Sequence, residues 1–143
     1  MTVFFSKKCE LGLQAVLFLS TQAKNKKFSA GEISKELKVP REFVSKVLQH
    51  LTESKIVGSQ KGKFGGFYLS KNPTKIKLID IVKAIDGLDV FNDCVLGFPG
   101  CSVKEPCPVH DKWGKLRDEA FRMLSEESLA QLKAKTLNKI KDL

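Results

Sequence analysis

The sequence lacks any long apolar run. Its 143 residues contain no stretch of the about 18 apolar side chains that a membrane-spanning helix needs. The first residues also lack the succession of a basic, an apolar and a small-residue region that defines a signal peptide. These absences predict a cytoplasmic protein with no membrane partner.

Cysteine is scarce, and so are the groups that enzymes use for catalysis. The chain has four cysteines and two histidines. Because a reducing cytosol disfavours stable disulfides, the cysteines indicate metal binding or redox chemistry instead. The sequence also has no phosphate-binding loop, no nucleophile–base signature and no paired carboxylates in an expected pocket. We therefore expect that the protein is not an enzyme.

Acidic residues are outnumbered by basic ones. Asp and Glu total 16 and Lys and Arg total 25, which gives a net charge of +9. The excess is concentrated between residues 35 and 77, where ten residues are basic and three are acidic. A focused basic segment indicates a polyanionic partner, although charge alone would also fit a solvated basic face.

The spacing of apolar residues predicts three helices in the first part of the chain, at about residues 7–23, 29–38 and 41–54. Ser29 and Glu32 have the spacing of a capping box at the start of the second helix. Two short helices joined by a short turn predict a helix-turn-helix. The outer face of the third helix offers side chains suited to DNA bases and phosphates, namely Arg41, Ser45, Lys46 and Gln49.

A basic hairpin follows the helix pair. Residues 56–60 and 67–69 are expected to form two strands, and the turn between them contains glycine and lysine. Turn glycines let the backbone approach a phosphate, and Lys61 and Lys63 could neutralise its charge. A plain surface hairpin is the alternative, but the order of helix, helix and basic hairpin favours a DNA-binding wing.

The last part of the chain predicts further helices. One covers about residues 78–85, a long one begins near His110, and a short one follows residues 125–128. An apolar seam runs along the long helix and fits either a dimer interface or core packing, with dimerisation favoured; it consists of Trp113, Leu116, Ala120 and Met123. The expected fold is mainly α with a small β-hairpin wing, a winged helix-turn-helix plus a long dimerisation helix. We expect a DNA-binding domain at 1–90, a cysteine-bearing sensor loop at 91–110, and dimerisation and C-terminal helices at 111–143.

Three cysteines and a histidine are grouped in the expected loop: Cys94, Cys101, Cys107 and His110. Thiolates are the usual ligands of iron–sulfur clusters, and imidazole can replace one of them. Cys3His is also a zinc-binding set, but the tight Cys-x2-Cys pair of most zinc sites is missing. Three unrelated cysteines remain the third alternative.

These features together resemble the Rrf2 family of bacterial transcription regulators. The resemblance rests on residues 6–8, 10–19, 33–37, 44–48, 65–69 and 78–87, and most specifically on the cysteine loop followed by residues 108–113. It implies a homodimer that binds a palindromic operator in double-stranded DNA, with the third helix in the major groove and the wing at the minor groove. The function implied is transcriptional regulation, with repression as the expected mode.

The resemblance also implies a [2Fe-2S] or [4Fe-4S] cluster held by Cys94, Cys101 and Cys107. The fourth ligand is His110 or Glu10 of the partner subunit, since members of the family differ on this point. The spacing from Cys94 to Cys101 is slightly longer than is usual in the family, so the cluster type stays open. Cys9 is additional and is expected near the surface, where it could be redox-active. Some members carry no cluster, and a clusterless regulator that responds through thiols, a small ligand or a protein partner is the alternative.

Overall fold

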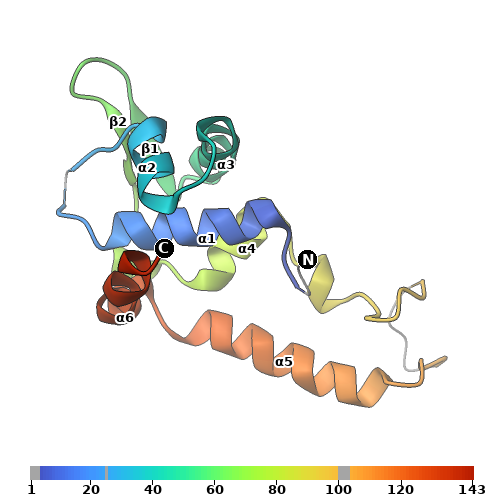
Figure 1. The fold of residues 1–143 in the computed structure, drawn as a ribbon. Helices are drawn as coiled ribbons and strands as arrows, with labels where there is room; N and C mark the ends of the chain where they lie inside the picture. The colour runs from blue at the N-terminus through green and yellow to red at the C-terminus, as the bar shows by residue number, and fades with distance from the viewer. Residues whose placement is uncertain (1–3, 25, 100–103) are drawn as a thin grey trace.

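The computed structural model describes residues 4–24, 26–99 and 104–143. Its elements in chain order are α1 (Lys7–Ser20), α2 (Ala30–Leu37), α3 (Arg41–Glu53), β1 (Val57–Gln60), β2 (Gly66–Leu69), the 3₁₀ helix η1 (Pro73–Lys75), α4 (Leu78–Ile85), the 3₁₀ helix η2 (Asp89–Phe91), α5 (His110–Glu126) and α6 (Leu129–Lys141). Figure 1 shows α2, α3 and the hairpin on one side of α1, and α5 and α6 on the other. The expected fold class, mainly α with a β-hairpin wing, is confirmed.

The helix-turn-helix begins with the predicted capping box. The Ser29 hydroxyl accepts a hydrogen bond from the Glu32 backbone N–H (3.1 Å), and the Glu32 carboxylate accepts one from the Ser29 N–H (3.2 Å). This satisfies two backbone donors that the first turn of α2 would otherwise leave unpaired. The helix ends at Leu37, and the cap residue Lys38, with its left-handed backbone (φ 56°), turns the chain towards Pro40 and α3.

The wing is a two-stranded antiparallel sheet tied to the helical body. Val57 pairs with Leu69 and Gln60 with Gly66, and the bridge between Phe28 and Phe67 joins the hairpin to the segment before α2. The Phe67 N–H donates to the Phe28 carbonyl at 2.7 Å. The base of the wing is therefore fixed to the core, while its turn extends away from it (Figure 1).

The core surrounds α1, which contacts α3, α4 and α6. Its fully buried side chains come from every one of these helices, among them Val16, Val47, Leu48, Ile81 and Leu129. The helix α6 is longer than the short helix expected from the sequence, because Ser128 caps it through a capping box and its apolar face packs onto α1 and η1. The helix α1 ends at Ser20 instead of Ala23, since the Ser20 and Thr21 hydroxyls donate to backbone carbonyls of the last turn.

The long helix α5 is only partly covered by its own chain. Trp113 and Leu124 are buried, but Leu116 is 59% exposed and Met123 is 64% exposed. The residues of the predicted seam therefore differ in environment. Trp113 packs within the chain, while Leu116 and Met123 face outwards. In the part of the chain that the structure describes, we find no helix with the length and apolarity required to cross a membrane.

Candidate functional site

The helix α3 presents polar side chains opposite its core face. Arg41, Lys46 and Gln49 are exposed and Ser45 is half-buried. Residues 41, 45 and 49 recur every fourth position, so they lie along one side of the helix. The opposite side consists of fully buried residues: Val44, Val47, Leu48 and Leu51. The predicted contact residues are therefore brought onto one accessible stripe, and this stripe is held in place by the core.

The wing adds two lysines in the turn that follows β1. Lys61 and Lys63 are both exposed in the turn, and β1 begins a few residues after α3 ends. The two elements also contact each other. The wing and α3 lie on the same side of α1 in Figure 1, away from α5 and α6. The positive charge that the sequence concentrates between residues 35 and 77 is thus carried by one part of the fold, with an exposed helix beside a basic hairpin.

Two of the loop cysteines lie together. Cys94 is buried and Cys107 is half-buried, and the Cys107 thiol makes a hydrogen bond to the Cys94 sulfur. Desolvation by itself would raise the pKa of the Cys94 thiol. Hydrogen bonds to its sulfur outweigh this effect and lower the pKa; the donors are the backbone N–H groups of Leu96, Phe98 and Gly97 and the thiol of Cys107. A turn closed by the Gly97 N–H on the Cys94 carbonyl (3.0 Å) orients these donors towards the sulfur. Such a nest of N–H groups stabilises a thiolate.

The rest of the predicted cluster site is less complete. Cys101 lies outside the described residues. His110 begins α5, three residues after the second of the paired thiols, and its N–H donates to the Cys107 carbonyl at 3.0 Å. Among residues 4–24, 26–99 and 104–143, no group of three or more His, Cys, Asp or Glu side chains has the arrangement of a metal site.

Glu10 and Cys9 are neighbours in the first turn of α1 but differ in environment. Glu10 is partly exposed, with 38% of its side chain accessible, and forms an ion pair with Lys7 (3.4 Å). Cys9 is fully buried, so the expectation of a surface thiol was wrong. It packs against Val82, Phe91 and Leu124 because it lies on the face of α1 towards α4 and α5. Burial, with added repulsion from Asp86, raises the pKa of the Cys9 thiol to about 12, which makes a redox role for it unfavourable.

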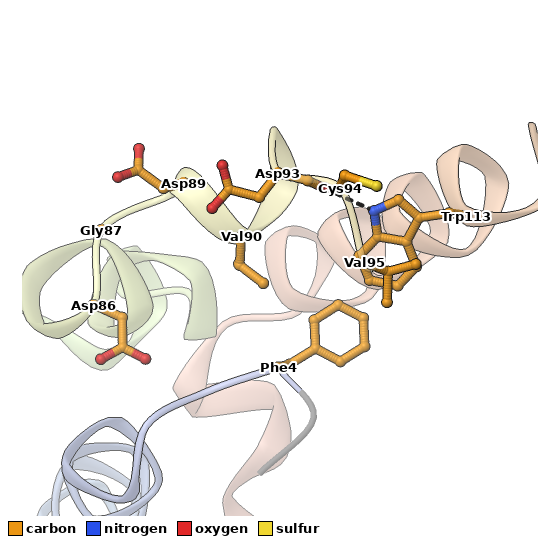
Figure 2. Close-up of a pocket in the computed structure, with 9 residues that line it drawn as sticks. All are labelled: Phe4, Asp86, Gly87, Asp89, Val90, Asp93, Cys94, Val95 and Trp113. Atoms are coloured by element: carbon orange, nitrogen blue, oxygen red, sulfur yellow. Dashed lines mark hydrogen bonds between the residues drawn. The ribbon is translucent and has the colours of Figure 1, made fainter. Parts of the chain in front are cut away.

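A hollow of about 380 Å³ lies next to Cys94. Its walls come from three segments that are distant in sequence, namely the residues before α1, the stretch that follows α4 and the start of α5: Phe4, Asp86, Gly87, Asp89, Val90, Asp93, Cys94, Val95 and Trp113. Figure 2 shows the Trp113 indole beside Cys94, with its Nε1–H donating to the Asp93 carbonyl at 3.0 Å. Phe4 stacks on the same indole, with ring centroids 5.5 Å apart. Trp113 therefore connects the start of α5 to the backbone next to Cys94.

The same hollow reaches the beginning of α1. Asp86, directly after α4, accepts hydrogen bonds from the Ser6 N–H (2.8 Å) and from the Ser6 hydroxyl. The Ser6 hydroxyl in turn accepts from the Cys9 N–H and caps α1. The sequence predicted neither the contact between Ser6 and Asp86 nor that between Trp113 and Asp93. Both contacts join residues that are far apart in the chain, so no local sequence pattern indicates them.

The arrangement defines a class of protein. A helix-turn-helix followed by a basic wing, on a body of further helices, is the architecture of winged-helix transcriptional regulators. The model of the Rrf2 family, described as iron-dependent transcriptional regulators, matches residues 5–135. The chain therefore belongs to the Rrf2 family, as its resemblance implied.

Relatives and solved structures agree with this assignment. A protein of Aquifex aeolicus named as an HTH-type transcriptional regulator is 34% identical over 119 residues, which cover 82% of each chain. A second, named Rv1287, from Mycobacterium tuberculosis, is 28% identical over 89% of this chain and 79% of its own. These relatives are DNA-binding regulators and not enzymes, so the expectation that the chain is not an enzyme is confirmed.

Two solved structures share the fold. CymR, titled the global cysteine regulator of B. subtilis, has a TM-score of 0.76 at 20% identity and covers 91% of this chain and 95% of its own. IscR of T. potens has a TM-score of 0.69 at 23% identity, with 90% of this chain and 85% of its own covered. At this level of identity the likeness concerns the fold.

Proposed function

We propose that the protein is a homodimeric, cytoplasmic regulator that represses transcription by binding a palindromic operator in double-stranded DNA. In this proposal Arg41, Ser45, Lys46 and Gln49 contact base edges and phosphates in the major groove, and Lys61 and Lys63 contact phosphates. The observation that carries the proposal is the exposed polar stripe of α3 beside the basic wing. A dimer fits a palindrome because each half-site is contacted by one recognition helix.

The apolar residues left uncovered on α5 support the homodimer. Leu116 and Met123 are separated by seven residues, which is two helical turns, and both are more than half exposed. A second α5 packed against this face would bury them. Replacing Leu116 with Glu should shift the protein from dimer to monomer in analytical ultracentrifugation. Replacement of Leu137, which is exposed on α6, by Glu is the matched control and should leave the dimer intact. A dimer unaffected by Leu116→Glu would contradict this interface.

The paired thiols support an iron–sulfur cluster as the sensing group. Cys94 and Cys107 lie together with backbone N–H groups directed at the Cys94 sulfur, and hydrogen bonds of this kind stabilise cluster-bound thiolates. We propose Cys94, Cys101 and Cys107 as ligands, with His110 or Glu10 of the partner subunit as the fourth. His110 follows Cys107 by three residues, while the partly exposed side chain of Glu10 is accessible to a partner. A bound cluster would supply redox and ligand-exchange chemistry at this loop.

The contacts around the loop give a route from the cysteines to the DNA-binding surface. Trp113 joins the backbone beside Cys94 to α5, and Asp86 joins the adjoining hollow to the start of α1. Since α1 packs directly on α3, a change of loop conformation can alter the orientation of the recognition helix. In the dimer, such a change would alter the relative position of the two recognition helices, and with it their fit to the two half-sites of the operator.

The test is operator affinity with and without iron. A duplex selected by the protein from a randomised library is titrated with protein reconstituted anaerobically with ferrous iron and sulfide, and with protein prepared without iron. We expect a tenfold or larger difference in Kd, corresponding to about 1.4 kcal/mol of coupling or more. The Cys94→Ala variant should bind equally with either treatment. An equal Kd for the wild-type protein would contradict cluster control but leave DNA binding in place.

A thiol switch without a cluster is the second candidate, and the Cys94–Cys107 hydrogen bond favours it. An oxidant such as hydrogen peroxide could convert these two thiols into a disulfide, releasing two electrons to the peroxide and forming water. Mass spectrometry of peroxide-treated, iron-free protein would detect the loss of two hydrogens in a peptide pair that joins Cys94 and Cys107. Absence of this pair would exclude the switch.

A further inference from the structure

The tip of the wing carries a phenyl ring that contacts little of its own chain. Phe64 is 83% exposed, more than any other large apolar side chain in the described residues. A phenyl ring in water forfeits the favourable free energy of burial and would regain it on contact with a partner. The ring has no role in the core, because the wing is tied to the body through Phe28 and Phe67 instead.

The turn that holds Phe64 is fixed in shape. The Gly65 N–H donates to the Gly62 carbonyl at 3.0 Å, and Gly62 has a left-handed backbone (φ 105°). A Cβ on Gly65 would overlap the Gln60 carbonyl, and one on Gly66 would lie 2.8 Å from the Phe28 backbone. The backbone on both sides of Phe64 therefore has a single conformation. Because the tip of the wing is preorganised, little conformational entropy is lost on binding.

The charge around the ring selects a polyanionic partner. Phe64 lies between Lys63 and Gly65, with Lys61 also exposed, and the Lys63 ammonium is 5.8 Å from the ring centroid. No acidic residue occurs between Glu53 and Asp80 in the sequence. An apolar ring bordered by lysines matches a minor groove, where deoxyribose faces and base edges lie between two rows of phosphates.

We infer that Phe64 enters the minor groove beside the half-site and wedges partly between the base pairs of one step, with Lys61 and Lys63 on the flanking phosphates. This inference rests on the proposed DNA binding and adds a specificity-determining residue to it. Partial unstacking costs least at flexible pyrimidine–purine steps. The ring therefore selects for a deformable step at the position that the wing reaches, without any hydrogen bond to a base.

The experiment compares variants of the full chain on DNA selected from a randomised library by the wild-type protein. The duplex carries 2-aminopurine at the wing-proximal step, whose fluorescence rises on unstacking. Phe64→Ala should bind about tenfold more weakly, should fail to raise the fluorescence, and should lose the preference for a pyrimidine–purine step in a repeated selection. Its salt dependence should equal that of the wild type, because no charge is removed. Phe64→Leu should restore part of the affinity.

Two controls separate this inference from the proposed function. Leu137→Ala also truncates an exposed apolar side chain, but on α6, and it should bind as the wild type does. All variants should unfold at the wild-type temperature, since Phe64 contributes little to the core. Wild-type affinity, fluorescence and step preference in Phe64→Ala would overturn the inference and leave the ring for a protein partner. A wild-type protein that enriches no DNA sequence would overturn the proposed function, and the inference with it.

Discussion

The segment that contains the recognition helix and the wing differs in construction from the segment that carries the cysteines. Four apolar side chains on the inner face of α3 are fully buried, and the wing is bonded to the backbone at Phe28. In the cysteine loop, by contrast, Val95, Leu96 and Phe98 are all about half exposed. The first segment has its shape fixed by the core, while the second exposes apolar surface around two paired thiols. The proposed DNA-contacting surface requires the first property, and the proposed sensor loop, which would change shape, requires the second.

Thiol reactivity should show the largest difference between the two segments. Cys9 in the body is fully buried with a pKa raised to about 12, whereas the pKa of Cys94 is lowered. Because only the thiolate reacts, iodoacetamide should modify the Cys94–Cys107 pair of iron-free protein at least about a thousandfold faster than Cys9 at neutral pH. Peptide mass spectrometry over a time course measures both rates. Equal modification rates in the folded protein would contradict the difference in reactivity between Cys9 and the pair. In urea, where the protein is unfolded, all the thiols should react at similar rates.

Truncation of apolar side chains should show the next largest difference. Leu51 on α3 is fully buried, and Leu51→Ala should lower the free energy of unfolding by about 2–5 kcal/mol through the lost burial and the cavity. Leu96 in the loop is 52% exposed, and Leu96→Ala should change it by less than about 0.5 kcal/mol. Urea denaturation of iron-free protein measures both. A destabilisation of several kcal/mol by Leu96→Ala would show that the loop is part of the folded core.

A smaller effect is expected at the wing lysines. Lys63→Ala should weaken binding to all DNA sequences to a similar extent and should lower the slope of log K against log salt by about one for each wing in contact with phosphate. Titrations of the selected duplex at several salt concentrations measure the slope, with Lys133→Ala on α6 as the control. An unchanged slope would argue against a phosphate contact at this position.

The sequence was sufficient to predict the elements whose signals are local. The capping box of Ser29 and Glu32, the helix over residues 78–85 and the basic hairpin each depend on residues within a few positions of one another, and the structure contains them. Helix ends were less accurate, because they depend on hydroxyl contacts such as that of Thr21 with the Phe18 carbonyl. The Rrf2 assignment could be made because its motifs are spread over nearly the whole chain.

Predictions that depended on long-range packing were less successful. Cys9 was expected near the surface, but α4 and α5 cover that side of α1 and bury it. The apolar seam of α5 was correct as a pattern, yet the pattern could not show that Trp113 faces Phe4 while Leu116 faces outwards. The roles of the loop cysteines, the DNA-contacting residues and the three-part division of the chain remain predictions.

The most direct test of the central claim is the iron and sulfide content of protein purified without oxygen, together with its visible spectrum. A cluster-binding regulator should be coloured and contain iron and acid-labile sulfide in equal amounts. Cys94→Ala should lose the colour and both elements, while Cys9→Ala should keep them because that thiol is fully buried among apolar side chains. Colourless wild-type protein that takes up neither iron nor sulfide on anaerobic reconstitution would contradict the cluster.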